Sequence, residues 1–237
     1  MSVAQEAGRL IAAAAGPRLA PLGLVRSGRS RLWYADHQWW LTVVEFQPGR
    51  SPGTYLNVGA MWLWAGRDRW AFDEGARLRW RPDGSWASEP PIGERGWTEH
   101  VGFLNPDQFA RDVAVVADIA AGQAAELRRQ FPDIHAVASG LISRPARRDE
   151  SPLWHAFHAG VAAALAGKTT IAEQNLARVA ATNSSTGWEH ALAAEASEIR
   201  DLVGDPAVLR EHIARVVNDS RHRLNLPPVR LELGPRP

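Results

Sequence analysis

The sequence predicts an α+β protein, in which a Trp-rich antiparallel sheet of about four to five strands precedes a bundle of helical hairpins. Two segments, 39–47 and 55–64, are rich in the aromatic and β-branched residues that are typical of strands. From Asn105 onward, apolar residues recur at spacings of three, four and seven, which is typical of amphipathic helices. Nine of the eleven tryptophans lie between Trp33 and Trp97, so the largest side chains gather in the predicted sheet.

The N-terminal part is expected to contain one helix and a series of short strands. Alanine dominates residues 3–15, whose apolar side chains recur at helical spacing, and the Gly-Pro pair at 16–17 is expected to end this helix. Residues 31–36 predict a short edge strand. Residues 76–81 alternate between apolar residues and arginines, which predicts a further strand, and Trp86 is expected to begin a return strand after a Pro-Asp-Gly turn.

The two strongest strand segments are expected to form a hairpin with Glu45 opposite Asn57. In this register one face is wholly apolar and is expected to be covered by the N-terminal helix and by a helix that follows residue 105. The other face is apolar at one end and polar at the other, where it carries Glu45, Tyr55 and Asn57. The apolar face comprises Trp40, Val44, Phe46, Leu56, Val58, Ala60, Trp62 and Trp64.

The C-terminal half is expected to be helical. Asn105 and the proline after it supply an N-cap followed by proline at the first helical position. The polar, proline-bearing segment 143–152 is the best candidate for a boundary. It predicts a sheet domain over residues 1–142 and a helical-hairpin region over residues 143–237, or one continuous domain. Further helices are expected over residues 153–166, 170–181, 188–203 and 206–224.

The composition limits the chemistry and the setting of the protein. The formal net charge is +1, which argues against a large basic surface, so nucleic acid is not expected as a partner. There is no cysteine, which excludes disulfides, thiolate nucleophiles and cysteine-ligated metals. No leader peptide and no apolar run long enough to cross a bilayer are recognised, which predicts a cytoplasmic protein that does not bind membranes.

Two short motifs resemble known sites but have simpler structural explanations. The Gly-Lys-Thr run at 167–169 looks like the end of a phosphate-binding loop, but Ala162 stands where that loop needs a glycine, and the preceding segment is helical in pattern. His155 and His158 could share a helix face and hold a metal, but no third ligand is patterned nearby. The sequence therefore predicts neither a metal nor a cofactor.

Five side chains of the predicted sheet are candidates for ligand binding. Glu45, Tyr55 and Asn57 lie on the mixed face, where a carboxylate beside apolar surface can act as a base or bind a ligand. Arg77 and Arg79 lie on the solvent side of the predicted third strand, where paired guanidinium groups can bind phosphate or an acidic partner. Charged side chains also keep such faces soluble, so a solvated strand surface is the simpler explanation for all five. No catalytic residue is assigned.

Four pieces of the N-terminal part match a known pattern. GLVRSGR at 23–29 is similar to a Gly-Phe-x-Lys/Arg-x-Gly-Arg opening, and Trp-Tyr at 33–34 to an aromatic strand that follows it. VVEFQ at 43–47 is similar to a strand that ends in Phe-Gln, and YLNVG at 55–59 to an Asn-x-Gly strand. On these residues, the stretch 23–80 resembles an uncharacterised bacterial family, the domain of unknown function 4304. The chain departs from that family in its many tryptophans and long helical half. The resemblance implies a similar α+β sheet and carries over no activity.

The sequence favours a protein-binding or regulatory accessory module without catalytic activity. The excess of tryptophan, the helical hairpins and the absence of the common catalytic motifs motivate this hypothesis. The partner is expected to be another protein or a second copy of the chain. The alternative is a small-ligand-binding protein or a hydrolase-like enzyme that uses the mixed face around Glu45, Tyr55 and Asn57. Nucleic-acid binding through the arginines ranks last.

Overall fold

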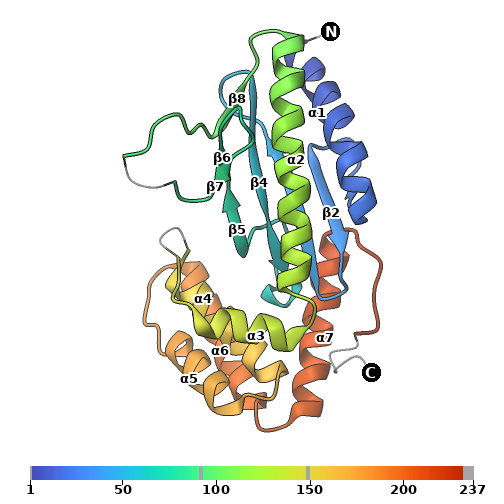
Figure 1. Ribbon diagram of the computed structural model, residues 1–237. Coiled ribbons are helices and arrows are strands. Elements are labelled where there is room, and N and C mark those ends of the chain that lie inside the picture. The colour runs from blue at the N-terminus through green and yellow to red at the C-terminus, as the bar shows by residue number, and fades with distance from the viewer. Residues whose placement is uncertain (1, 91–92, 148–149, 232–237) are drawn as a thin grey trace. The chain divides into compact units, whose positions relative to one another are not determined.

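The computed structural model describes residues 2–90, 93–147 and 150–231. Within these residues the protein has an α+β fold with seven α-helices and an antiparallel sheet of six strands, which confirms the predicted fold class (Figure 1). The chain divides into two compact units. The first comprises the described residues of Met1–Met61 and Trp70–Arg129, and the second those of Trp62–Arg69 and Gln130–Pro237. The domain limits expected from the sequence, 1–142 and 143–237, stay a prediction.

The first unit is built on the six-stranded sheet. In this sheet β1 to β5 follow one another in chain order, and β8 pairs with the beginning of β4. The two long strands, β3 and β4, are the segments with the strongest strand pattern, and they are neighbours as expected. The strands are β1 (Val25–Arg26), β2 (Leu32–Asp36), β3 (Trp40–Gln47), β4 (Gly53–Trp62), β5 (Glu74–Arg77) and β8 (His100–Gly102).

The predicted third strand is divided between two sheets. β5 pairs with β4 and ends at Arg77, whereas β6 (Arg79–Trp80) forms a separate hairpin with β7 (Trp86–Ala87). The prediction of one strand over residues 76–81 is therefore wrong, although the return strand at Trp86 is confirmed. The division arises because Trp80 exchanges its two backbone hydrogen bonds with Thr98 rather than with β4.

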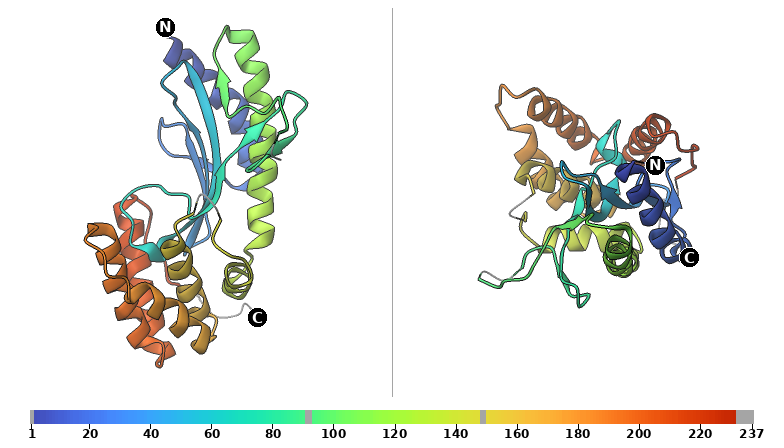
Figure 2. Two further views of the ribbon diagram at one scale, coloured as in Figure 1. Left: turned by 90° about the vertical axis from the view of Figure 1, so that its left-hand side faces the viewer. Right: turned by 90° about the horizontal axis from the view of Figure 1, so that it is seen from above.

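Helices α1 (Val3–Leu19) and α2 (Pro106–Gln130) lie side by side over one face of the sheet (Figures 1 and 2). The predicted apolar face of β3 and β4 is buried, and Trp40, Val44 and Val58 each expose no more than 3% of their surface. Apolar side chains of α2 fall on the expected stripe and are buried as well. Burial of this continuous apolar surface is the main stabilising contribution to the unit.

Helix α1 continues through the Gly-Pro pair that was expected to end it. Pro17 lies in the last turn, where a proline removes a single backbone hydrogen bond, and the N–H of Ala20 still bonds to the carbonyl of Gly16. At the other end, Ser2 and Gln5 form a reciprocal capping box. The helix is therefore longer than its pattern of alanines indicated.

The second unit is a bundle of helical hairpins, as predicted. Asp205 caps the last helix by accepting hydrogen bonds from the backbone N–H groups of residues 207 and 208. Helix α3 is not predicted by the sequence. Within the described residues, no helix combines the length and the apolar character needed to cross a membrane. The helices are α3 (Ile134–Ser143), α4 (Pro152–Leu165), α5 (Thr169–Ala180), α6 (Gly187–Leu202) and α7 (Pro206–Arg223). The short 3-10 turn η2 (Leu63–Ala65), which follows β4 in the chain, belongs to the same unit.

The tryptophans include buried core residues and exposed ones. Six of them, at positions 33, 39, 40, 62, 64 and 80, are buried. In the second unit Trp62 stacks on Trp64 with ring centroids 5.2 Å apart, and Phe131 meets Trp62 edge-on. Trp86 and Trp188 are different, because they expose 39% and 44% of their surface.

Candidate functional site

Asn57 is the centre of a polar cluster on the mixed face of the sheet. Its side chain is buried, and its amide nitrogen donates to Oε2 of Glu45 and to Oε1 of Gln47, both at 3.1 Å. Arg77 lies directly opposite Asn57 on β5 and donates from Nε to Oδ1 of Asn57 at 3.3 Å. The structure therefore brings together three of the five residues that the sequence singled out.

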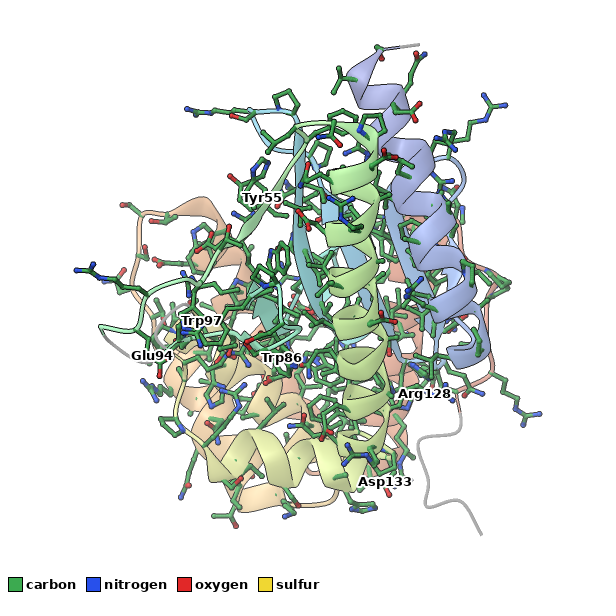
Figure 3. All side chains as sticks on the ribbon, turned by 45° about the horizontal axis from the view of Figure 1, so that its top comes forward. Tyr55, Trp86, Glu94, Trp97, Arg128 and Asp133 are labelled. Atoms are coloured by element: carbon green, nitrogen blue, oxygen red, sulfur yellow. The ribbon has the colours of Figure 1, made fainter. Side chains whose placement is uncertain are left out.

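Tyr55 extends the cluster towards β8. The guanidinium carbon of Arg77 lies 4.2 Å from the centre of the Tyr55 ring, and the ring of His100 lies 4.9 Å from Tyr55 on the neighbouring strand. Glycine at position 49 makes room for both rings, because a Cβ there would lie 3.0 Å from Tyr55 and 3.2 Å from His100. Tyr55, labelled in Figure 3, thus takes part in a packed aromatic and cationic stack.

Arg79 belongs to a different set of contacts. Its Nε and Nη2 atoms bind Oε1 of Glu99 at 2.8 and 2.6 Å, and its Nη1 donates to the carbonyl of Ser88 at 2.8 Å. Glu99 also lies 4.0 Å from Arg77, so one carboxylate serves both arginines. A phosphate or an acidic partner would have to displace this carboxylate, which makes the arginines a poor anion site.

The hydrogen-bonding capacity of the Asn57 cluster is largely used within the cluster. Both hydrogens of the Asn57 amide are donated to neighbours, and its oxygen accepts from Arg77. A buried amide that is satisfied in this way stabilises the sheet and has no donor left for a ligand. The outward part of the cluster is the guanidinium of Arg77, whose side chain is 39% exposed.

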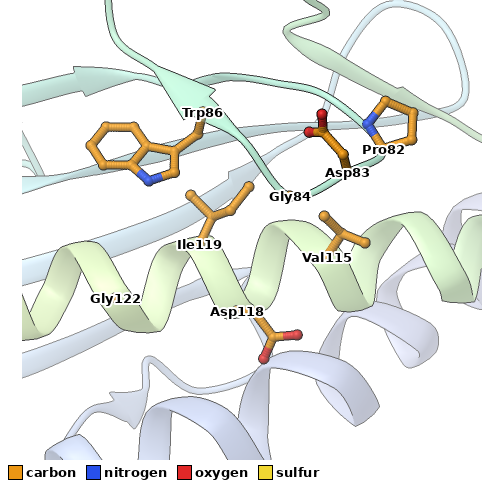
Figure 4. Close-up of a pocket in the computed structure, with 8 residues that line it drawn as sticks. All are labelled: Pro82, Asp83, Gly84, Trp86, Val115, Asp118, Ile119 and Gly122. Atoms are coloured by element: carbon orange, nitrogen blue, oxygen red, sulfur yellow. The ribbon is translucent and has the colours of Figure 1, made fainter.

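A groove lies elsewhere in the first unit, between the β6–β7 hairpin and helix α2 (Figure 4). Its volume is about 410 Å³. Trp86 and Ile119 face each other across it, and the exposed surface of Trp86 contributes to its wall. The groove is lined by Pro82, Asp83, Gly84 and Trp86 from the hairpin and by Val115, Asp118, Ile119 and Gly122 from α2. The sequence does not predict it, because its two walls are distant in the chain.

Two carboxylates border this groove and each is held by a partner. Asp118 forms a double ion pair with Arg18 of α1, through Nε–Oδ1 at 2.6 Å and Nη2–Oδ2 at 3.3 Å. Asp83 accepts from the hydroxyl and the backbone N–H of Ser85, which lowers the pKa of its carboxyl below the ordinary value. Both carboxylates point away from the side chains of Val115 and Ile119 (Figure 4).

Arg81 lies beside the groove and is also engaged. Its Nη2 donates to Glu94 and to the carbonyl of Arg95, both at 2.9 Å, and its guanidinium carbon lies 4.1 Å from the Trp97 ring. The indole N–H of Trp97 donates to the same oxygen of Glu94, and the two residues are labelled side by side in Figure 3. Glu94 therefore balances the charge of Arg81.

The two histidines that the sequence singled out, His155 and His158, have structural partners. His155 lies 3.2 Å from Oε1 of Glu150 and 3.2 Å from the carbonyl oxygen of Arg144. Nδ1 of His158 accepts from the indole N–H of Trp64 at 3.2 Å. In the part of the chain that the structure describes, no group of three or more potential ligands is placed to hold a metal ion.

Glu195 of α6 is the most perturbed carboxyl of the second unit. Its pKa is raised to about 7, mainly by burial and also by the nearby charge of Glu198, whereas the charges of Arg223 and Arg67 oppose the shift. Arg67 in turn stacks on Trp154, with its guanidinium carbon 4.2 Å from the ring centre, and Trp154 lies parallel to the exposed Trp188. The sequence gives no sign of this carboxyl, because its pKa depends on residues from three separate segments.

Comparison of the chain with protein-family models, with curated proteins and with solved structures found no match.

Proposed function

We propose that this protein is a protein-binding accessory module, and that the groove between the β6–β7 hairpin and α2 receives an apolar side chain of a partner protein. The exposure of Trp86 carries this proposal. Its side chain is 39% exposed beside the groove, whereas the six core tryptophans are buried. Exposed tryptophan that lines a concavity is typical of the centre of a protein interface.

The chemistry of the groove favours a protein over a small molecule. Four of its eight lining residues, Pro82, Trp86, Val115 and Ile119, contribute apolar side chains. Small-molecule sites usually add several convergent polar groups that orient the ligand. Here the two carboxylates are held by Ser85 and Arg18. Such a groove selects its occupant by shape and apolar area.

The polar cluster around Asn57 supports the alternative less well. A ligand-binding protein or a hydrolase-like enzyme would need donors and acceptors that are free to meet a substrate. The amide of Asn57 is occupied by Glu45, Gln47 and Arg77 instead. We therefore assign the cluster a role in holding β3, β4 and β5 together.

Filling the groove from helix α2 tests the proposal. Apart from its chain neighbours and the adjacent helix backbone, no atom lies within 4 Å of a Cβ built at Gly122, so the side chain of Gly122→Leu starts in open space at the groove. Leucine and alanine both favour a helix over glycine by about 1 kcal/mol, so neither variant should impair folding. Gly122→Ala is the matched control, because it gives the same gain in helix propensity and leaves most of the groove open.

The probe is a displayed library of random peptides selected on the immobilised wild-type protein. We expect peptides that bind the wild type and Gly122→Ala alike and bind Gly122→Leu at least about tenfold more weakly, a loss of about 1.4 kcal/mol. The proposal is overturned if no peptide is enriched. It is also overturned if the enriched peptides bind all three proteins equally.

A further inference from the structure

The mouth of the Trp86 groove carries a carboxylate in a fixed position. Asp83 lies in the turn between β6 and β7, and its Oδ1 accepts from Ser85 N at 2.9 Å and from Ser85 Oγ at 2.6 Å. Both bonds end on the same oxygen, so within the described residues Oδ2 remains available to a donor from outside. These hydrogen bonds also lower the pKa of Asp83, which keeps it ionised.

The other charges around the groove are already balanced. The charge of Asp118 is matched by Arg18, which approaches it with two nitrogens. Arg81 of β6 is matched by Glu94. Asp83 has no such cationic partner within hydrogen-bonding distance among the described residues, and no basic side chain lines the groove. An occupant therefore meets the apolar side chains of the groove and, at its mouth, the carboxylate of Asp83, which forms no ion pair among the described residues.

We infer that the partner segment carries a lysine or arginine next to its apolar anchor, and that this basic side chain binds Asp83. The inference rests on the proposed docking of a protein at this groove. Charge complementarity of this kind contributes mainly to specificity and association rate, while the apolar anchor contributes most of the affinity. An acidic residue at the same place would be repelled by Asp83. Arginine has an additional contact available, because its guanidinium can stack on the exposed Trp86 ring.

The test uses the peptides that the library selection enriches, and their sequences are the first result. We expect an apolar residue adjacent to lysine or arginine to recur among them. Asp83→Asn keeps the oxygen that accepts from Ser85 and removes the charge, so the turn is retained. We expect this variant to bind the peptides about fivefold more weakly, as for one exposed ion pair. The affinity of Asp83→Asn for the peptides should also depend less on salt concentration than the affinity of the wild type.

Glu173→Gln is the matched control for charge. Glu173 is exposed on α5 and does not line the groove, so the variant changes the net charge by the same amount at a residue outside the groove lining. The inference is overturned, and the docking proposal kept, if peptides sensitive to Gly122→Leu lack a basic residue or bind Asp83→Asn as well as the wild type. Both are overturned if no peptide is sensitive to Gly122→Leu, or if the groove proves to mediate self-association that Gly122→Leu abolishes.

Discussion

The amide nitrogen of Asn57 donates a hydrogen bond of 3.1 Å to Oε2 of Glu45, across the two longest strands of the sheet. Asn57 is buried whereas Glu45 is only half-buried. The amide of Asn57 therefore needs this hydrogen bond, because water does not replace it. The same amide binds Gln47, and its oxygen accepts from Arg77. Asn57 is therefore the residue on which the whole cluster depends.

Asn57→Ala is expected to lower the free energy of unfolding by about 1–3 kcal/mol, because it leaves partly buried polar groups without a partner. Arg79→Ala is the control, because its ion pair with Glu99 is partly exposed and should contribute about 0–1 kcal/mol. Urea denaturation followed by tryptophan fluorescence measures both values. Equal effects of the two substitutions would show that the cluster is not organised around Asn57.

Gly59 and Gly75 face each other on β4 and β5, where the backbones approach closely. A Cβ at Gly75 would lie 2.2 Å from the carbonyl oxygen of Val58, and its φ of +102° disfavours any other residue. We expect Gly75→Ala to destabilise the protein by about 3 kcal/mol or more. Gly84→Ala is the control, since Gly84 also has a positive φ of +84° but its Cβ would meet no atom within 4 Å. Gly84→Ala should lower the free energy of unfolding by about 1–2 kcal/mol, measured by thermal or urea denaturation. A similar decrease for both variants would contradict the steric argument.

Glu195 contributes more stability to the second unit in acid than at alkaline pH. Its pKa is raised from 4.5 to about 7, so the folded state holds a proton more tightly than the unfolded state. The stabilisation by this group is complete below pH 4.5 and is lost as the pH rises through about 7. The groups that face it are Glu198 on its own helix, Arg67 of the 62–69 segment and Arg223 of α7.

Glu195→Gln is therefore expected to be more stable than the wild type by about 1–3 kcal/mol at pH 8 and to lose this advantage below pH 4.5. Urea denaturation at several pH values between 4 and 8 measures the difference. Glu173→Gln on the exposed face of α5 should show no such dependence. A constant difference between Glu195→Gln and the wild type at all pH values would mean that Glu195 does not titrate in this range.

His37 in the first unit has the opposite effect on the pH dependence of stability. Its ring stacks on Trp40 with centroids 4.0 Å apart, and its Nε2 lies 2.9 Å from Oγ1 of Thr42. Its pKa is lowered from 6.5 to about 4, mainly by burial and also by the charge of Arg128, while the charge of Asp36 opposes the shift. The unfolded state binds the proton more tightly, so this contribution to stability is complete above pH 6.5 and is lost as the pH falls through about 4.

His37→Gln should remove this part of the acid sensitivity. We expect the wild type to lose about 1–2 kcal/mol more than the variant between pH 7 and pH 5. Denaturation curves at the two pH values give the comparison, with His190→Gln as the control because His190 is exposed. If His37→Gln and the wild type lose stability in parallel, the ring of His37 is protonated at its ordinary pKa.

Local patterns in the sequence were sufficient for the long elements and for part of the candidate site. The alternation of side chains along β3 and β4 predicted which residues share a face, and the apolar face is buried as expected. It did not predict burial as such, because Leu41, Val43 and Met61 of the other face are buried as well. The same alternation placed Glu45 near Asn57, which the hydrogen bond between them confirms. Asn105 and the proline after it marked the start of α2, because helix capping is a local interaction.

The tertiary structure decided what depends on segments that are distant in the chain. The two-residue strand β1 and the three-residue strand β8 are too short to carry a pattern of their own, and β8 exists because β4 offers an edge to it. Eleven tryptophans look alike in the sequence, but only packing buries six of them and leaves Trp86 exposed beside α2. The groove and the raised pKa of Glu195 arise in the same way, because volume and desolvation are properties of residues brought together by folding.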